Sequence, residues 1–395
     1  MTEPIRPAGT PAGSPTDPPG EFPGGQALFR LDPRVSHLNH GSFGAVPVPV
    51  QEAQEALRAE AHADPDAFFI GVSDRLAAAR GRIAERLGAD PDHLSFVSNA
   101  TEGANLALDA IPFADGDEIL VSDHGYGTVV AAAARRAPVT TVALDSRLPD
   151  EDAVRETVLA ALTPRTKVAV LDHVSSPTAR IIASPRLLAD LRERGVTTVV
   201  DGAHAPGMLA EPLAGGADFY FGNLHKWGYA PSGSAFLAVA PQHRRRVRAL
   251  VPSWEDEHGF PRSVEYRATV DYTGWLAAPE GLDLIHRLDA AKVRAHNSTL
   301  AAHGAALLAE IPGITPLPYD DALAMRALRL PSGVAETRDE ATELRERIAA
   351  EQGIRVLIWP WPGGGGIRVC GQIYNRPAEY ERLAAVLPSY LLRHA

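Results

Sequence analysis

The chain has 395 residues, 45% of them hydrophobic and 22% charged, with a formal net charge of −11. Its length provides for a large core in two or three domains, and its acidic balance argues against a nucleic-acid partner. A single cysteine, Cys370, leaves no disulfide within the chain and no cysteine metal cluster, so we expect no metal site. No apolar stretch is long enough to span a bilayer and no secretory signal is apparent, so we expect a cytoplasmic protein without a membrane partner.

The N-terminal part of the chain leads from a tail into helices. Residues 1–26 are rich in proline and glycine and predict a disordered tail. The turn-rich segment 27–50 follows, and we expect it to join a small domain to the active site. Apolar residues at helical spacing then predict helices over 50–63 and 73–89.

From residue 93 on, short apolar strands alternate with helices. The predicted strands lie at the start of 93–111 and within 117–124, 166–176, 197–204, 217–223 and 234–239. Amphipathic helices such as 184–195 connect them. This alternation predicts an α/β fold whose mostly parallel sheet is covered by helices on both faces.

The C-terminal part has a different pattern. One long helix or two joined helices are predicted over 276–311, and short strands over 326–332, 354–360 and 367–375. A final helix is expected over 377–394. We therefore predict a large domain over 51–280 and a smaller α+β domain over 281–395.

Residues able to bind ligands or take part in catalysis follow several of the predicted strands. In open α/β sheets, ligands bind at these strand ends. "SNATEGANLAL" (98–108) leads from a strand into a helix whose start, with Thr101, forms either an anion site or a plain cap made by Ser98 or Thr101. Tyr126 lies just past another strand and either stacks on a flat cofactor or packs over a loop.

The next two strand ends carry charged groups. Asp201 follows a buried strand and either caps a helix or needs a partner such as a protonated pyridine nitrogen. His204, three residues on, can contact a phenolic oxygen or a carboxylate. In "FGNLHKWGYAPSGSAF" (221–236), Lys226 is either a buried amine able to form a Schiff base, or a lysine whose head reaches water. Its neighbours Asn223 and His225 are donors suited to phosphate.

Taken together, an anion cradle, an aromatic ring, a carboxylate and a lysine in an apolar setting are the groups that hold pyridoxal 5′-phosphate (PLP). Beyond its tail the chain resembles the fold-type I PLP-dependent enzymes of the class V aminotransferase family, and within it the isopenicillin N epimerase-like members. The motifs that carry this resemblance are "LNHGSFG" (38–44), "HVSSPTA" (173–179), "DGAHAPGM" (201–208), "GADFYFGNLHKW" (216–227) and "IRVCGQIYN" (367–375). The resemblance implies a seven-stranded sheet in the large domain and a homodimer with shared active sites.

The resemblance also implies roles for individual residues. Lys226 would be the Schiff-base lysine, Asp201 the partner of the pyridine nitrogen, and His204 a neighbour of the phenolic oxygen. Tyr126 would stack on the ring. The phosphate would be bound by Ala100, Thr101, Asn223 and His225, together with Thr273 of the neighbouring subunit.

The substrate side of the site follows from the same resemblance. Arg368 would bind an α-carboxylate with its planar guanidinium, unless it forms a surface salt bridge. Asn39 and His40 would line the substrate entrance. Ser176 departs from the asparagine of cysteine desulfurases and agrees with the epimerase-like members, and Cys370 lies in strand-like sequence as a small buried residue, so desulfurase chemistry is disfavoured.

The implied reaction proceeds at Cα of an amino acid or small peptide with a free α-carboxylate, through an external aldimine and a quinonoid. Epimerisation or racemisation in secondary metabolism is the main expectation, with C–S lysis by β-elimination or transamination as alternatives. Lys226 can act as the base in all three. Epimerisation needs a second proton donor, for which His40, Tyr126 and His204 are candidates. A PLP-fold protein without turnover is disfavoured because both Lys226 and Asp201 are present.

Overall fold

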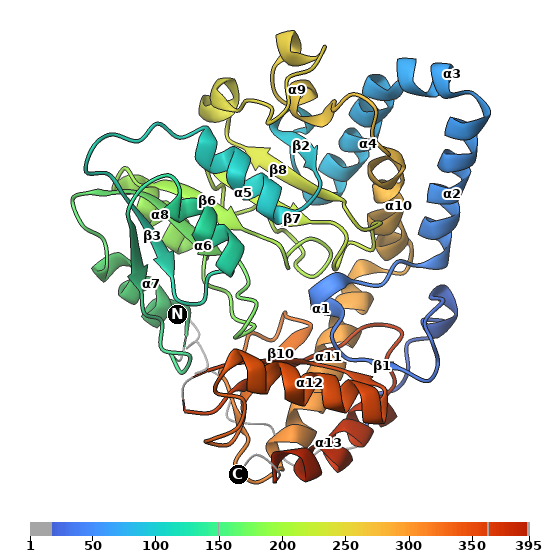
Figure 1. The fold of residues 1–395 in the computed structure, drawn as a ribbon, viewed down its shortest axis with the longest axis vertical. Coiled ribbons are helices and arrows are strands. Elements are labelled where there is room, and N and C mark those ends of the chain that lie inside the picture. The colour runs from blue at the N-terminus through green and yellow to red at the C-terminus, as the bar shows by residue number, and fades with distance from the viewer. Residues whose placement is uncertain (1–17, 149, 362, 393–395) are drawn as a thin grey trace, which may run out of the picture.

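The computed structural model describes residues 18–148, 150–361 and 363–392 (Figure 1). Residues 1–17 of the predicted tail lie outside this part of the chain. The rest of that prediction needs correction, because Phe22 is partly buried against the core and its ring packs edge-on against His296 at 5.3 Å. A short 3-10 helix follows at Gln26–Leu28. Order therefore begins before residue 27.

The large sheet has seven strands in the order β2-β8-β7-β6-β5-β3-β4. Their bounds are β2 Leu94–Val97, β3 Glu118–Ser122, β4 Val139–Val142, β5 Thr166–Asp172, β6 Thr197–Asp201, β7 Phe219–Asn223 and β8 Ala235–Val239. β8 pairs antiparallel with both β2 and β7, and the other neighbours are parallel. The predicted α/β fold with a mostly parallel seven-stranded sheet is confirmed.

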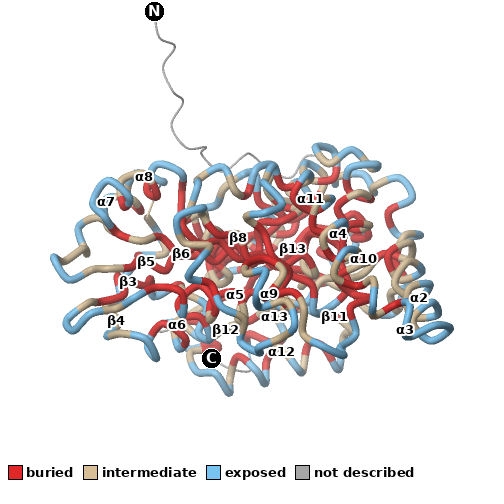
Figure 2. The backbone as a smooth tube through the Cα atoms, turned by 90° about the horizontal axis from the view of Figure 1, so that it is seen from above, coloured by how far each residue is buried: buried red, intermediate tan, exposed pale blue. Residues whose placement is uncertain are grey.

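Helices cover both faces of this sheet because its strands are apolar on both sides. Along β7, Phe219 and Phe221 pack with α5 (Ala100–Asp109) and α6 (Gly127–Ala134). Tyr220, between them, points to the opposite face and the core formed with α4, α7, α8 and α10. These four helices span Val72–Leu87, Glu151–Ala160, Pro185–Glu193 and Thr273–Arg287. Figure 2 shows the buried backbone concentrated around the central strands.

A second sheet lies in the C-terminal part, in the antiparallel order β12-β13-β10-β9. Its strands are β9 Thr315–Pro316, β10 Met325–Arg329, β12 Leu357–Trp359 and β13 Gly366–Cys370, and its helices are α11 Ala290–Ala309, α12 Arg338–Gln352 and α13 Pro377–Leu391. Of the two alternatives predicted for 276–311, the structure has two helices, α10 and α11, separated where Asp289 adopts φ +67° and caps α11. The predicted boundary at residue 281 falls inside α10, so we propose that the domains divide at Leu288–Asp289.

The N-terminal segment runs between the two sheets. β1 (Ser36–His37) pairs in parallel with β11 (Ile354–Arg355), and α1 (His40–Phe43) follows at once. Figure 1 shows α1 between the large sheet and the C-terminal elements. The remaining helices are α2 Val48–Ala63, α3 Pro65–Ile70 and α9 Arg262–Glu265. Segment 27–50 thus reaches both parts of the molecule.

Two further searches concern the described residues alone. None of their helices combines the length and apolarity that crossing a membrane requires. In the same residues, no group of three or more His, Cys, Asp or Glu side chains is arranged to hold a metal ion.

Candidate active site

A cavity of about 280 Å³ opens at the carboxyl ends of three neighbouring strands. The last residues of β5, β6 and β7, which are Asp172, Asp201 and Asn223, all line it. Its other walls are formed by Ser42, Phe43, Asn99, Ala100, Thr101, Tyr126, Ser176, Ala203, His204, His225 and Lys226. Most of the residues predicted from strand ends therefore meet in one place, because parallel strands bring their carboxyl ends to the same edge of a sheet.

Lys226 lies in the turn that follows β7. The amides of Leu224 and His225 both donate to the carbonyl of Ser234 at 3.0 Å, which ties this turn to the start of β8. The side chain is half-buried, and its Nζ lies 3.4 Å from Nε2 of His204. Burial lowers the pKa of Lys226 from 10.5 to about 8, against the opposing effect of Asp201. The structure therefore has a half-buried lysine on the cavity wall whose amine loses its proton more readily than an exposed lysine does.

Three glycines hold this turn from outside by close backbone contact. A Cβ on Gly44 would lie 2.1 Å from the carbonyl oxygen of His225, and one on Gly207 would lie 2.2 Å from that of Trp227. A Cβ on Gly281 would lie 2.2 Å from the oxygen of Gly228. We call Gly44, Gly207 and Gly281 the glycine clamp. Any side chain at these positions would displace the backbone that carries the lysine.

Asp201 and His204 lie next to this amine. One carboxylate oxygen of Asp201 accepts a 2.9 Å hydrogen bond from the amide of Ala203, and no helix begins there, so Asp201 is not a helix cap. Burial raises the pKa of Asp201, while that amide and Lys226 oppose the rise. Burial and Lys226 hold the pKa of His204 well below its usual value. Nδ1 of this neutral ring accepts from Trp227 Nε1 at 3.4 Å, so its proton is on Nε2, toward Lys226.

Asp172 is a cavity residue that the sequence reasoning missed. It is the register partner of Asp201 on the neighbouring strand, so the two buried carboxyl groups lie on one edge of the sheet. Burial and the charge of Asp201 raise the pKa of Asp172 well above its usual value. The available signal was that "KVAVLD" ends on an aspartate just as "TTVVD" does.

The start of α5 forms the anion-binding end of the cavity. Its cap is Asn99, whose Oδ1 accepts from the amide of Glu102 at 2.9 Å, and neither Ser98 nor Thr101 has the capping role that the sequence analysis considered. The amide of Ala100 donates to Oδ1 of Asn223 at 2.8 Å. The Ala100 amide and the Asn223 side-chain oxygen therefore satisfy each other's hydrogen-bonding need. The Thr101 hydroxyl lies 3.2 Å from that of Thr128, and Thr101 lines the cavity.

His225 and Tyr126 complete the predicted cofactor residues in the cavity wall. Nδ1 of His225 donates to the carbonyl of Ser234 at 2.9 Å, and burial lowers the pKa of the ring. A dianion bound beside the ring would raise that pKa, because it favours the protonated form. The protonated ring would then carry a second N–H, on Nε2. Tyr126 precedes α6 and is 51% exposed, so one side of its ring is available for stacking.

Arg368 lies behind the cavity wall, in the middle of β13. Its side chain is buried, which excludes the surface salt bridge, and burial lowers its pKa. Nη1 donates to the carbonyl and the hydroxyl of Ser176 at 2.6 and 3.1 Å, and Nη2 donates to Oδ1 of Asn39 at 3.3 Å. Nε has no hydrogen-bond partner in the described part of the chain. The guanidinium thus retains capacity for an anionic ligand.

Besides Arg368 and Asn39, two further predicted residues, His40 and Thr273, lie outside the cavity wall. The ring of His40 contacts the hydroxyl of Tyr374 at 3.1 Å and the carbonyl of Lys226 at 3.0 Å, and burial lowers its pKa to about 4. It supports the lysine turn and is outside the cavity wall. Thr273 is buried at the start of α10, where its hydroxyl donates to Asp271 at 2.5 Å. It is not among the residues that line the cavity.

The arrangement fits PLP on the chemistry of its groups. A half-buried amine, a buried carboxylate, an aromatic ring and a helix start with a hydroxyl all face one cavity. These are an aldehyde-reactive group, a partner for a pyridine nitrogen, a stacking surface and a phosphate site. Cys370 is buried and accepts from the amide of Gly41 at 3.5 Å, so its surroundings are those of a packed core residue.

Comparisons with known proteins agree with this fit. The sequence profile of the family described as Aminotransferase class-V matches residues 49–383. Isopenicillin N epimerase of Streptomyces clavuligerus is 34% identical over 90% of this chain and 95% of its own, and the putative L-cysteine desulfhydrase 2 of Oryza sativa subsp. japonica is 28% identical over 89% and 84%. The solved structure of a C-DES mutant with glycine covalently linked to its PLP cofactor superposes with a TM-score of 0.79, at 21% identity, over 92% of this chain and 98% of that one.

Proposed function

The chain belongs to the class V aminotransferase family, and on that premise we propose that it is an epimerase or racemase of secondary metabolism, acting at Cα of an amino acid or small peptide with a free α-carboxylate. It is a PLP-dependent enzyme. The observation that carries the proposal is Lys226, a half-buried amine with a pKa lowered to about 8, beside Asp201 and His204 in a cavity at the strand ends. The 34% identity to isopenicillin N epimerase favours epimerisation.

PLP, when bound, stabilises negative charge at Cα of an attached amino acid. Lys226 would hold it, Asp201 would keep a proton on its ring nitrogen, and Thr101, Asn223 and His225 would bind its phosphate. Lys226 Nζ, largely neutral above pH 8, takes a proton from Cα. The His204 Nε2 proton faces that amine and orients its lone pair.

Arg368 orients the substrate. Its two terminal nitrogens are occupied by Ser176 and Asn39, so a carboxylate that displaces either contact gains a charge-assisted bond at the same guanidinium. Because Ser176 lines the cavity and Arg368 lies behind it, the serine determines how closely the carboxylate can approach. We infer that Asn39 acts in substrate binding through this contact.

Inversion needs a second proton donor on the face opposite Lys226. His40 is engaged on both ring nitrogens and lies outside the cavity wall, and His204 lies 3.4 Å from Lys226 itself. Of the three candidates, Tyr126 remains, because it lines the cavity without contact to the lysine in the described chain. We propose that the Tyr126 hydroxyl returns the proton.

Incubation with amino acids and peptides in heavy water tests this function. We expect deuterium at Cα together with inverted configuration, and loss of both in Lys226→Ala. Tyr126→Phe should still exchange the Cα proton of one enantiomer but should no longer invert it. Release of pyruvate and sulfide, or amino-group transfer to an oxo acid, would instead establish lysis or transamination.

C–S lysis is the second candidate. Its support is the 28% identity to a putative L-cysteine desulfhydrase over 89% of the chain, and the fact that β-elimination needs only one base, which Lys226 provides. Under this alternative Tyr126→Phe would leave sulfide release nearly unchanged. Absence of any aldehyde absorbance change on mixing with PLP would favour a protein without turnover.

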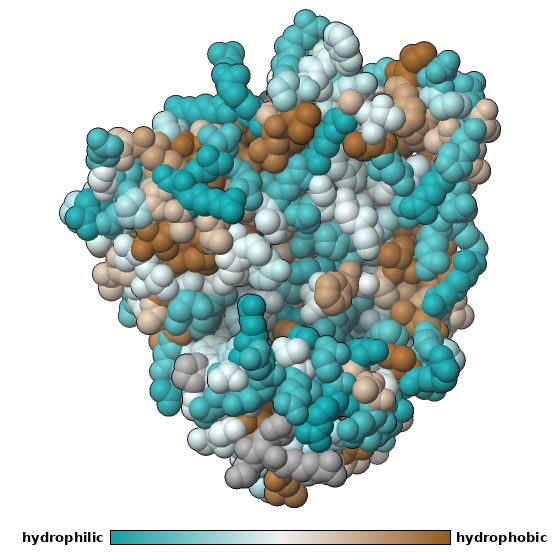
Figure 3. Space-filling view, viewed as in Figure 1, coloured by the Kyte–Doolittle hydropathy of each residue, from teal (hydrophilic) through white to brown (hydrophobic). Residues whose placement is uncertain are grey.

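A homodimer with shared active sites is also proposed. Phe43 lines the cavity yet is 81% exposed, and Trp254 is 87% exposed, which leaves large apolar side chains uncovered in a single chain. Hydrophobic patches interrupt the hydrophilic surface on the face seen in Figure 3. Thr273 would then serve the partner's phosphate. Light scattering should give twice the mass of one chain, and a monomer would contradict this proposal.

A further inference from the structure

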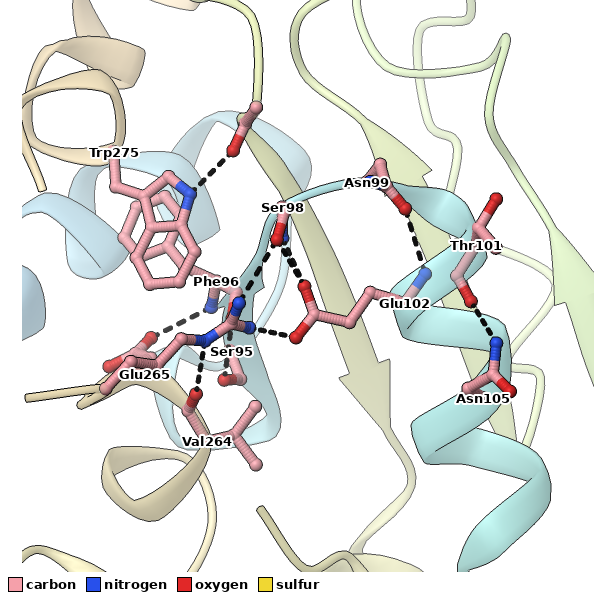
Figure 4. Close-up of polar contacts among 12 residues, drawn as sticks. Ser95, Phe96, Ser98, Asn99, Thr101, Glu102, Asn105, Val264, Glu265 and Trp275 are labelled. Atoms are coloured by element: carbon pink, nitrogen blue, oxygen red, sulfur yellow. Dashed lines mark hydrogen bonds and ion pairs between the residues drawn. The ribbon is translucent and has the colours of Figure 1, made fainter. Parts of the chain in front are cut away.

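A carboxylate lies in the first turn of the helix that forms the phosphate end of the cavity. Glu102 is the third residue of α5, and its side chain turns back toward Ser98, as Figure 4 shows. One of its oxygens accepts from the Ser98 amide at 2.7 Å and from the Ser98 hydroxyl at 2.5 Å. This contact shapes the turn from β2 into α5. It also places a negative charge within one helical turn of Thr101, where a phosphate dianion is to bind.

Arg267 forms an ion pair with this carboxylate from a distant part of the sequence. Its Nη2 bonds to the other oxygen of Glu102, and its Nη1 donates to the Ser98 hydroxyl at 3.1 Å. The guanidinium lies over the ring of Trp275 at 4.9 Å, and Trp275 stacks on Phe96 with an angle of 12° between the rings. Both charged side chains are mostly buried, so solvent screens them weakly.

The charges on this helix end explain why the pair is needed. The start of a helix attracts anions because its amides carry partial positive charge, and a nearby carboxylate competes with a bound anion for that attraction. With its charge cancelled, Glu102 can hold Ser98 without repelling the phosphate. We propose that Arg267 is a positioning residue for the cofactor phosphate, which neutralises Glu102 so that the start of α5 accepts a dianion. This inference rests on the proposed function.

The alternative is that Arg267 only holds its own segment in place. Its amide also donates to the Tyr272 hydroxyl at 2.7 Å, and that hydroxyl donates to the carbonyl of Ala268 at 2.8 Å, so a supporting role for the loop is built into the same residue. The two roles differ in what a loss of Arg267 would affect. A charge effect acts on the phosphate alone, whereas a collapsed loop would impair binding of the whole cofactor.

Binding of PLP and of pyridoxal, which lacks the phosphate, to the full chain freed of cofactor separates these roles. Affinities are measured by absorbance titration for wild type, Arg267→Met, Arg267→Lys, Glu102→Gln and the double variant Arg267→Met/Glu102→Gln. Arg262→Met is the matched control, because Arg262 lies in the same segment but pairs with Glu255 at 2.9 Å, away from α5.

We expect Arg267→Met to weaken PLP binding by about tenfold and to change pyridoxal binding by less than about twofold. Arg267→Lys should retain most of the PLP affinity, and the double variant should regain it, because the uncompensated charge is gone. Arg262→Met should bind both ligands as wild type does. Equal losses for PLP and pyridoxal, or no recovery in the double variant, would overturn the inference.

Glu102→Gln alone keeps the test decisive if Arg267→Met does not fold. Removing the carboxylate should leave PLP affinity unchanged or raise it relative to pyridoxal. A selective fall in PLP affinity would contradict the charge argument. If wild type itself binds neither ligand, the proposed function fails and this inference with it; if wild type binds PLP and the variants show equal losses, this inference alone fails.

Discussion

Replacing Lys226 by methionine should stabilise the cofactor-free protein. The side chain is half-buried, and its pKa falls from 10.5 to about 8 because loss of solvation penalises the charged form. At about 1.4 kcal/mol for each tenfold change in a protonation equilibrium, the fold disfavours the protonated lysine by about 3 kcal/mol. Below pH 8 the full penalty applies, because Lys226 is protonated in both states and only the folded state disfavours its charge. Methionine has similar length and no charge, and it removes the penalty.

The sign of the pH dependence follows from proton binding. Between pH 8 and 10.5 the unfolded state binds more protons at this residue than the folded state, so the stability of wild type rises with pH there. The advantage of Lys226→Met should therefore be about 3 kcal/mol at pH 7, should fall to about 1 kcal/mol at pH 10 and should vanish above pH 10.5. All other titratable groups are the same in both proteins, so their contributions to the pH dependence cancel when the variant is compared with wild type at each pH.

Urea unfolding of both proteins without cofactor, at several values between pH 7 and 10, measures this difference. Lys292→Met is the control, because Lys292 is exposed on α11 and its replacement should leave the pH dependence as in wild type. A difference between Lys226→Met and wild type that stayed constant across this range would refute the reasoning. A less stable variant at pH 7 would do so as well, because it would mean that the protonated amine is stabilised by its surroundings.

Three further outcomes are expected. Asp201→Asn should lower kcat by about 100-fold, since no carboxylate then faces the cofactor nitrogen, and steady-state kinetics with saturating PLP would reveal an intact rate as the contrary result. Arg368→Lys should raise KM for substrates with a free α-carboxylate by about tenfold and leave the corresponding amides unaffected; equal effects on both would contradict the assigned contact. Arg80→Met should destabilise the protein by about 3–5 kcal/mol at pH 8, because it leaves the buried Glu265 without its partner, and by less below pH 7, since burial raises the pKa of Glu265 to about 7; a loss independent of pH in urea unfolding would argue against this.

The sequence predicted the candidate site residues that lie at the end of a strand or just after it. Asp201, Asn223 and Lys226 could be predicted because each ends or follows an apolar strand, and strand ends of a parallel sheet share one edge. Asp172 has the same pattern, but the predicted strand segment 166–176 runs past it, so its place as the last residue of β5 was not evident from the sequence. β4 could not be predicted, because Val139–Val142 is a short edge strand with a single buried residue and lacks the apolar signal of the inner strands.

Local sequence patterns could not predict the contacts between segments that are distant along the chain. Nothing near His40 in the sequence shows that its ring supports the carbonyl of Lys226, which is 186 residues away. The Thr273 hydroxyl, by contrast, bonds to Asp271, only two residues away along the chain. The cap of α5 depended on which of three neighbouring polar residues adopts extended backbone, and Asn99 does so. Tertiary packing determines which of these residues caps the helix, and a single sequence does not show that packing.

The glycine clamp limits how this scaffold can acquire new reactions. Gly44, Gly207 and Gly281 come from three separate regions of the chain, and each touches the backbone on which the reactive amine is mounted. The turn therefore cannot be shifted by substitution at any one of them without a collision. Selection for a different substrate or stereochemical outcome would have to act on residues that face the cavity, such as Phe43 and Tyr126, while the position of the amine stays constant across descendants of this protein.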